Sequence, residues 1–144
     1  MELAEARALV EAKTDKDITV RHLISVEGVM RALARRLGQD EDRWTLAGLF
    51  HDLDQDRTGE DSNRHAYLAA EWLRDAGVEE PVINAVLAHA HEHYRTDLMA
   101  KAVVHADAVA GLLVAAALVR PERSAGMKVS SVKKKLREKA FAPG

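Results

Sequence analysis

Helical periodicity runs through almost the whole chain and limits the possible folds more than any other feature. Apolar residues recur at three- and four-residue spacing in successive segments, whereas the two-residue alternation of a half-buried strand is nowhere convincing. Glycine and proline interrupt the pattern where helices would end, as at Gly38, Gly77 and Pro121. The sequence therefore predicts an all-α fold, a single compact domain over residues 1–144 with about six to seven helices.

The same spacing places the individual helices. We expect them at about 3–13, 17–37, 40–53, 62–76, from 81 to at least 89, 98–119 and 129–140. Asp17 or Thr19 would cap the second helix, Asp40 or Asp42 the third, and Ser62 or Asn63 the fourth. Residues 54–63 are rich in Asp, Arg, Gly and Ser, so we expect a polar loop there.

Composition restricts the chemistry and the partners. The chain has no cysteine, so any metal must be bound by nitrogen and oxygen atoms. A net charge of −2 argues against a general nucleic-acid binder, and we expect no sequence-specific nucleic-acid partner. The first thirteen residues lack the pattern of a signal peptide, and the longest apolar run, residues 109–119, is too short to span a bilayer. We therefore expect a cytoplasmic protein without a membrane partner.

Charge is concentrated at the C-terminal end. Residues 128–141 carry a net charge of +5, so the rest of the chain sums to −7. This predicted basic helix has three interpretations: a solvated face docked by Val129, Val132 and Leu136, a cover that attracts an anionic substrate, or a contact with a partner. The long apolar helix at 98–119 also fits either a buried position or a homodimer interface.

Candidate metal ligands are spread along the chain. His51 and Asp52 are adjacent and close an apolar stretch, which presents an imidazole and a carboxylate at the edge of a buried helix. Asp107 lies in a very apolar helix, where an ionised carboxylate needs a metal, a cation or hydrogen-bond donors. Capping of a neighbouring helix or pairing with an arginine would also satisfy Asp107.

Several histidines complete the set. His22 lies one turn into the second helix, His65 begins the fourth, and His89 ends the apolar face of the fifth. Each is either a metal ligand or an ordinary packing or surface residue. His93 shares the face of His89, whereas His105 lies about 200° around the helix from Asp107 and is expected to be structural or supporting.

The order of these residues resembles the HD superfamily of metal-dependent phosphohydrolases. The sequence Ala47-Gly48-Leu49-Phe50-His51-Asp52-Leu53-Asp54 is similar to the central signature of that family, and Ala102-Val103-Val104-His105-Ala106-Asp107-Ala108 is similar to its final one. Arg64-His65-Ala66 and Ala85-Val86-Leu87-Ala88-His89 match the histidines of dinuclear members. The tail, residues 111–142, resembles that of small bacterial members of the superfamily.

The resemblance implies a ligand set and a reaction. Asp52 would bridge two divalent transition-metal ions (Mn, Fe, Co, Ni or Zn), with His22, His51 and Asp107 on one ion and His65 and His89 on the other. A water activated by these ions would cleave a phosphoester or phosphoanhydride of a nucleotide or small phosphate ester. The alternative is a regulatory HD module that binds a nucleotide or a metal but does not catalyse a reaction.

Residues outside the ligand set have weaker support. Asp54 is the nearest spare carboxylate and would orient the water or protonate the leaving oxygen, unless it caps the next helix. Phosphate contacts would come from Arg57, Arg64, Arg95 or Lys101, each of which is equally a solvated surface charge. Leu53-Asp54-Gln55 replaces the Gly and Lys that many HD phosphohydrolases have after the doublet, which weakens transfer of any particular substrate.

Overall fold

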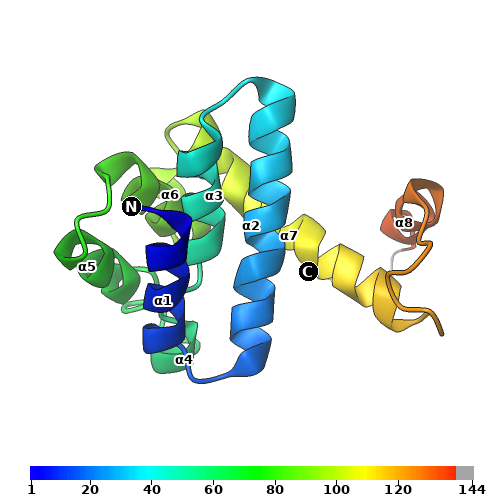
Figure 1. Cartoon of the computed structure of the whole chain (residues 1–144), viewed down its shortest axis with the longest axis horizontal. Coiled ribbons are helices and arrows are strands. Elements are labelled where there is room, and N and C mark those ends of the chain that lie inside the picture. The colour runs from blue at the N-terminus through cyan, green and yellow to red at the C-terminus, as the bar shows by residue number, and fades with distance from the viewer. Residues whose placement is uncertain (139–144) are drawn as a thin grey trace.

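The computed structural model describes residues 1–138, and no strand occurs among them. The elements are α1 (Leu3–Lys13), α2 (Asp17–Leu37), α3 (Glu41–Phe50), α4 (Gln55–Thr58), α5 (Tyr67–Asp75), α6 (Glu80–Ala90), the 3₁₀ turn η1 (Glu92–Tyr94), α7 (Leu98–Leu118) and α8 (Val129–Leu136). The predicted all-α fold is therefore confirmed. Figure 1 shows a compact body from which the second half of α7 and α8 extend; we call residues 111–138 the arm.

Four helices meet at the centre of the body. Helices α2, α3, α6 and α7 pack against one another, α1 packs on α3, and α5 packs on α6. Their apolar faces supply fully buried side chains such as Met30, Phe50, Val86 and Val103. Trp44 is also buried in this core. The body therefore forms because each amphipathic helix buries its apolar stripe against the others.

Helices α2 and α3 approach each other closely at Gly48. A Cβ atom on this residue would lie 2.8 Å from the Val26 carbonyl oxygen and 2.9 Å from Cγ of Met30. Only a residue without a side chain fits such a gap. Because Gly48 lies one turn before His51, this contact sets how the end of α3 faces α2.

One predicted helix cap is confirmed and another is wrong. Asp40 caps α3 as expected, since its side chain accepts a hydrogen bond from the Arg43 N–H at 3.0 Å. Helix α2, however, begins after Lys16, which provides no side-chain cap. Support comes instead from Asp56 in α4, whose carboxylate accepts hydrogen bonds from the Asp15 and Lys16 N–H groups and from the Thr19 hydroxyl. This cap arises from a distant segment, which local sequence does not reveal.

The segment between α3 and α5 also differs from expectation. The predicted polar loop contains the short helix α4, and α5 begins only at Tyr67 instead of near Ser62 or Asn63. Ala66 precedes α5 with a φ of 66°, in the left-handed region that alanine rarely adopts. His65 therefore lies in a turn before the helix and not on it.

Helix α7 changes surroundings along its length. It has a mean hydropathy of 1.7 over its most apolar window, of which 33% is buried, and among residues 1–138 it alone has the length and composition to cross a membrane. That is weak support for a membrane span, because core helices pass the same test, and Val103 and Ala106 of its first half are buried in the core. The apolar helix is longer than the run seen in the sequence, and the predicted homodimer through it stays a prediction.

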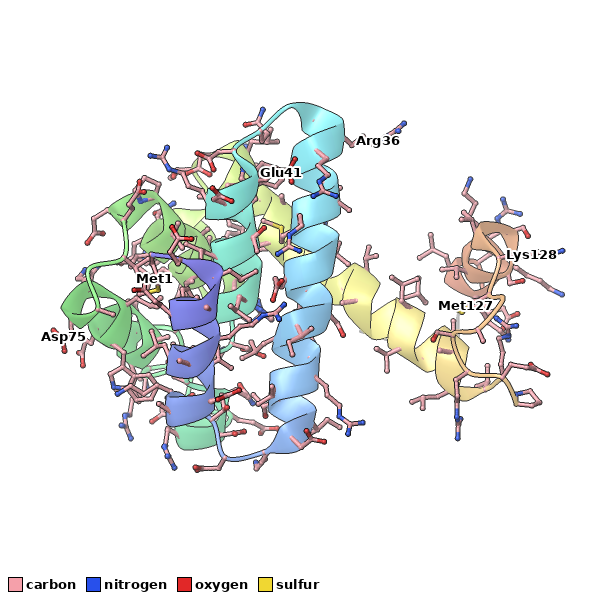
Figure 2. All side chains as sticks on the ribbon, in the orientation of Figure 1. Met1, Arg36, Glu41, Asp75, Met127 and Lys128 are labelled. Carbon is pink, nitrogen blue, oxygen red and sulfur yellow. The ribbon has the colours of Figure 1, made fainter. Side chains whose placement is uncertain are left out.

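The arm holds α8 away from the body (Figure 1). Figure 2 shows Met127 and Lys128 at its far end, apart from the packed side chains of the body. Val129 and Leu136 are 73% and 70% exposed and only Val132 of the predicted apolar face is half-buried, so of the three interpretations the docking of α8 through Val129 and Leu136 is wrong. The predicted part of this helix beyond residue 138 lies outside the described residues.

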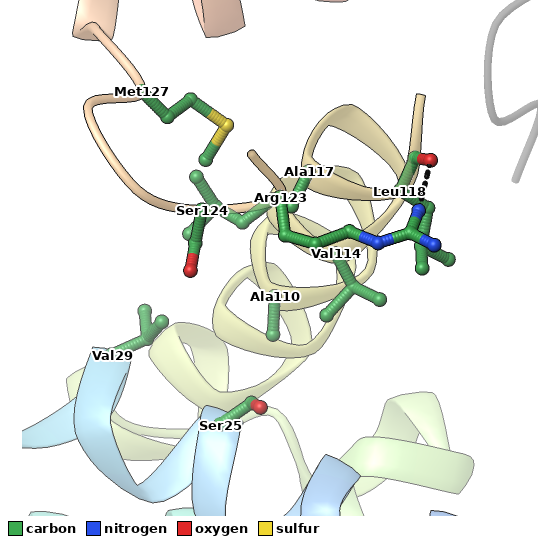
Figure 3. Close-up of a pocket in the computed structure, with 10 residues that line it drawn as sticks. Ser25, Val29, Ala110, Val114, Ala117, Leu118, Arg123, Ser124 and Met127 are labelled. Carbon is green, nitrogen blue, oxygen red and sulfur yellow. Dashed lines mark hydrogen bonds between the residues drawn. The ribbon is translucent and has the colours of Figure 1, made fainter. Parts of the chain in front are cut away.

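A cavity of about 580 Å³ lies between α2 and the arm. Ser25 and Val29 line it from α2, and Ala110, Val114 and Met127 line it from α7 and the following loop (Figure 3). None of the predicted metal ligands lines this apolar cavity, so it is separate from the candidate site described next.

Candidate metal centre

The fold brings all six predicted ligands together. His22 comes from α2, His51 and Asp52 from the end of α3, His65 from the turn before α5, His89 from the last turn of α6, and Asp107 from the middle of α7. These residues are separated by up to 85 positions in the sequence. The four central helices and the turn before α5 therefore each deliver part of one cluster.

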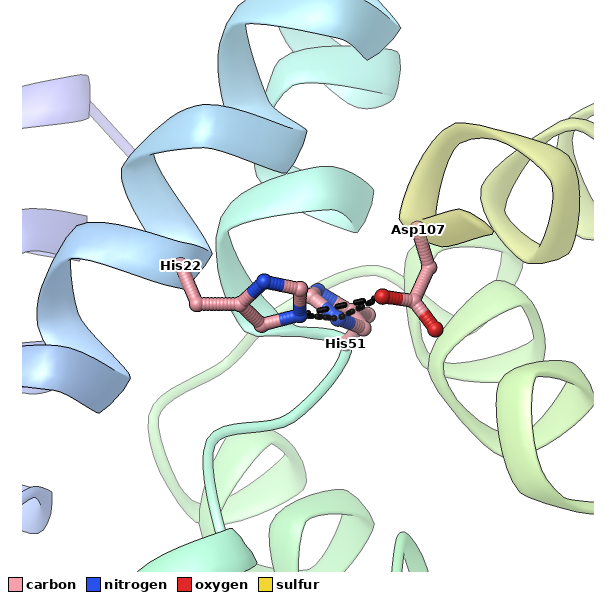
Figure 4. Close-up of side chains that lie close together, drawn as sticks. All are labelled: His22, His51 and Asp107. Carbon is pink, nitrogen blue, oxygen red and sulfur yellow. Dashed lines mark hydrogen bonds and ion pairs between the residues drawn. The ribbon is translucent and has the colours of Figure 1, made fainter. Parts of the chain in front are cut away.

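Three of the ligands form the first group. The Nε2 atoms of His22 and His51 lie 3.1 Å apart, and His22 Nε2 is 3.0 Å from Oδ1 of Asp107. His51 Nε2 lies 3.8 Å from the same oxygen. Figure 4 shows the two imidazoles and the carboxylate pointing toward one another from three different helices. Three donor atoms thus converge on one small volume.

Asp52 lies between this group and the remaining histidines. Its Oδ1 atom is 3.1 Å from His65 Nε2 and 3.2 Å from His89 Nε2. Its Oδ2 atom is 3.9 Å from the Nε2 atoms of both His22 and His51. The two oxygens of one carboxylate therefore face two different pairs of histidines.

Two sets of donor atoms are compact enough for a single ion each. Within each set every donor lies within 4.8 Å of the others: His22, His51 and Asp107 in one, and His51, Asp52 and His89 in the other. The first set is the group that the resemblance assigned to one ion. The second set contains His51, whereas the resemblance assigns His65 to the second ion together with His89 and Asp52. His65 nevertheless contacts Asp52.

His51 is the most deeply buried ligand. Its side chain is fully buried, and its Nδ1–H lies 2.8 Å from the Gly48 carbonyl oxygen, which accepts the hydrogen bond. That bond leaves the Nε2 lone pair facing the other ligands. Burial lowers the pKa of His51 to about 4, so the ring is neutral at physiological pH, the form that binds metal.

The opposite shift occurs at His65. Hydrogen bonds with Asp52 and then Asp54 raise the pKa of His65 to about 9. Burial by itself raises the pKa of Asp52, but hydrogen bonds from His65 and His89 outweigh that effect and leave it well below its usual value. In the absence of a metal, the negative charge of Asp52 is thus balanced by protonated imidazole.

The donor set fits a divalent transition metal. Oδ1 of Asp52 is buried and faces the Nε2 atoms of His65 and His89, and the buried Nδ1 of His89 has no hydrogen-bond partner within residues 1–138. Imidazole nitrogens and carboxylate oxygens without sulfur suit Mn, Fe, Co, Ni or Zn. The cluster therefore has the chemistry of a metal site, with donor atoms that lie close together and are largely shielded from solvent.

Comparison with known families agrees with this geometry. The profile of the HD domain matches residues 19–112, which include all six predicted ligands. The chain belongs to the HD domain family. The resemblance found in the sequence is thereby confirmed, and the His51-Asp52 doublet corresponds to the central feature from which it was inferred.

The curated relatives of this HD domain include several bacterial ribonucleases. The chain is 34% identical over 90 residues to ribonuclease Y 2 of Levilactobacillus brevis, and the match covers 62% of this chain and 17% of that protein. It is 34% identical over 83 residues to ribonuclease Y of Sulfurovum sp., with 58% and 16% covered. The chain thus spans less than a fifth of these relatives. No solved structure matches it significantly.

Asp54 has a different place from the one expected of a catalytic acid. Its side chain is fully buried, Oδ2 accepts a hydrogen bond from the Ala69 N–H at 3.0 Å, and Oδ1 lies 3.0 Å from His65 Nδ1. It therefore supports α5 and the far side of His65. This position fits the alternative of helix capping better than direct contact with a substrate.

The predicted phosphate contacts are not brought to the ligands by this fold. Arg57 pairs with Asp15 through both guanidinium nitrogens, which ties α4 to the start of α2. Arg95 donates a hydrogen bond to the Ala88 carbonyl oxygen at 3.1 Å. Arg64 and Lys101 are exposed, and no contact within residues 1–138 joins either to the cluster. Their role in substrate binding stays a prediction.

Two neighbours of His65 were not predicted from the sequence. The Thr58 hydroxyl lies 3.2 Å from His65 Nδ1, and His91 Nε2 lies 3.0 Å from the His65 carbonyl oxygen. His93 is exposed in η1 and does not share the face of His89, because α6 ends at Ala90. The only sequence signal for His91 is its two-residue separation from His89.

Proposed function

We propose that this HD domain is a metal-dependent phosphohydrolase that cleaves a phosphoester or phosphoanhydride bond of a nucleotide or small phosphate ester. One observation carries the proposal: the two oxygens of Asp52 face two different pairs of histidines, while Asp107 completes the group around His22. Membership of the HD family supports the same chemistry.

Some residues of the chain would bind the ions, and others would orient the residues that bind them. His22, His51 and Asp107 would hold one divalent ion, His65 and His89 a second, and Asp52 would bridge them. Bound ions supply Lewis acidity, which activates water and neutralises phosphate charge. His51, kept neutral by burial, presents its Nε2 lone pair without competition from a proton. Asp54 and the Gly48 carbonyl oxygen orient the imidazoles of His65 and His51.

RNA is a second candidate substrate. The relatives matched here are named ribonuclease Y, and the match lies within the HD domain that contains the six ligands. Hydrolysis of an RNA phosphodiester uses the same activated water and the same charge neutralisation as hydrolysis of a nucleotide. A panel of substrates therefore has to include both.

Metal content and turnover test the proposal together. Metals are measured by mass spectrometry on untagged protein and on His65→Ala and Asp107→Ala, followed by hydrolysis assays with nucleotides, phosphate esters and a short RNA. We expect about two ions per chain, loss of metal in both variants, and loss of turnover in Asp52→Ala with the circular dichroism spectrum retained.

His105→Ala is the matched control, because His105 is exposed on α7 two residues before Asp107 and contacts none of the ligands. It should keep both metal and turnover. Tight nucleotide binding without turnover across several metals would contradict the enzyme and favour the silent regulatory module.

A further inference from the structure

A row of aromatic rings begins at the edge of the metal centre. Tyr67 stacks on His91 with ring centroids 4.3 Å apart and an angle of 29° between the planes. The centroid of the Tyr94 ring lies 6.4 Å from those of both rings, and the His93 ring lies tilted by 40° against Tyr94 at 4.2 Å. We call these four residues the aromatic row. They come from the start of α5 and from the turn that follows α6.

The row is joined to the metal centre at two points. Tyr67 is two residues after His65, and His91 is two residues after His89, so each connection between a candidate ligand and a ring spans at most about 7 Å of extended chain. His91 also donates a hydrogen bond from Nε2 to the His65 carbonyl oxygen at 3.0 Å. A shift of the row would therefore move two metal ligands.

The backbone between His65 and Tyr67 is strained. Ala66 is fully buried and has a φ of 66° and a ψ of −29°, a conformation normally left to glycine. Strain of this kind persists only where the surrounding structure requires it, and it concentrates at functional sites. Here the left-handed conformation of Ala66 lets the residue before it, His65, face Asp52 while the residue after it, Tyr67, stacks on His91.

The outer ring of the row is available to a ligand. Tyr67 stacks on His91 with one ring face and turns the opposite face away from that stack, and the residue as a whole is 36% exposed. A planar aromatic group can stack on such a face regardless of its hydrogen-bonding pattern, as nucleobases do on tyrosine in proteins that bind single strands.

We propose that the ring face of Tyr67 opposite His91 is the stacking site for the base of a nucleotide whose phosphate lies at the metal centre. This inference rests on the proposed function and narrows its substrate class to phosphates that carry an aromatic base, including the end of a single-stranded RNA. Phosphate esters without a base would then bind more weakly, because they reach the metal centre but make no stacking contact with Tyr67.

The test compares two probes that differ only in the base: adenosine 5′-monophosphate and ribose 5-phosphate. Binding to the manganese-loaded protein is measured by calorimetry, and hydrolysis of both is followed separately. Since one stacked base strengthens binding by roughly ten-fold or more, we expect the nucleotide to bind at least that much tighter. Tyr67→Ala should abolish the preference, whereas Tyr67→Phe should keep it.

The variants separate stacking from damage to the fold. Tyr67→Leu retains an apolar side chain over His91 but no aromatic face, so it should lose the preference with an unchanged metal content. Equal binding of the two probes by the wild type, or an undiminished preference in Tyr67→Ala, overturns the inference. Failure to hydrolyse any phosphate ester while the base preference is present would count instead against the proposed enzyme.

Discussion

At the scale of single residues, Asp54 contacts the ring nitrogen of His65 that faces away from the other metal ligands. The His65 imidazole faces Asp52 with Nε2, and its Nδ1 lies within 3.2 Å of both Asp54 and Thr58. An N–H donated to Asp54 fixes the tautomer that leaves Nε2 free to bind a metal. We therefore expect Asp54 to position His65 and not to contact the substrate.

Replacing Asp54 tests this role. Asp54→Asn retains one acceptor oxygen, so the amide cannot serve both the Ala69 N–H and His65 Nδ1. We expect the affinity for Mn²⁺, measured by competition with a chelator, to fall about 10- to 100-fold.

Asp56→Asn is the matched control, because Asp56 is a neighbouring buried carboxylate that touches no histidine. It should lower stability without changing metal affinity. Equal losses of metal affinity in the two variants would show that Asp54 acts only through the fold.

Protonation of His65 makes metal binding depend on pH. Hydrogen bonding to Asp52 and Asp54 raises the pKa of His65 to about 9, so in metal-free protein at pH 7.5 the ring carries a proton. A metal ion needs that lone pair and must displace the proton. The affinity should therefore rise with pH by about ten-fold per pH unit for each proton displaced, and should level off as pH passes through the pKa of His65.

Calorimetric titration with Mn²⁺ in two buffers of different ionisation enthalpy measures the released protons. His65→Gln should release about one proton fewer per chain than the wild type, and His105→Gln should release the same number. An unchanged count in His65→Gln would mean that His65 is neutral in the metal-free protein.

At the scale of helices, the contact between α2 and α3 decides the spacing of the centre. Gly48 leaves no gap for a Cβ atom, and its carbonyl oxygen accepts the hydrogen bond that orients His51. Gly48→Ala would push α3 away from the Val26 backbone and therefore move His51 relative to His22. We expect a loss of about 1–3 kcal/mol in the free energy of unfolding, with weaker metal binding, both measurable by denaturation and chelator competition.

Gly28→Ala gives the matched control for this helix pair. Gly28 lies in the interior of α2, and a Cβ there would meet no atom within 4 Å. Alanine should stabilise the helix by about 0.5–1 kcal/mol and leave metal affinity unchanged. Two variants of the same type with opposite effects on stability would establish that the close approach at Gly48, and not helix propensity, is responsible.

At the scale of the whole molecule, the body contains all the candidate metal ligands and the arm contains none. All six ligands lie within residues 22–107, before the arm begins, and α8 has no buried residue. Deleting residues 121–144 should therefore change the free energy of unfolding by less than about 1 kcal/mol and leave metal affinity unaltered. Thermal and chemical denaturation with chelator competition would measure both.

Deleting residues 1–14 should have a far larger effect. Helix α1 buries Ala6 and Val10, and Arg7 pairs with the buried Glu27, which would retain only Arg31 as a partner. We expect a loss of at least about 3 kcal/mol. A similar loss on removal of the arm would show that the arm stabilises the body.

The sequence alone determined the helices and the kinds of ligand. Apolar spacing, Gly38 and Asp40 are local signals, so they place most helix ends correctly. The order of His22, His51-Asp52 and Asp107 was enough to recognise the HD domain. Residues 54–66 were predicted poorly, because α4, the late start of α5 and the left-handed Ala66 depend on Asp54 and Asp56 packing against distant segments.

Tertiary structure alone decided which donor faces which. The two oxygens of Asp52 reach different histidines because five segments meet at that point, and no periodicity encodes such a meeting. The same holds for Asp54 behind His65 and for the stacking of Tyr67 on His91. Helix formation depends on neighbours within a turn, whereas a metal centre depends on side chains that meet only after the helices have packed.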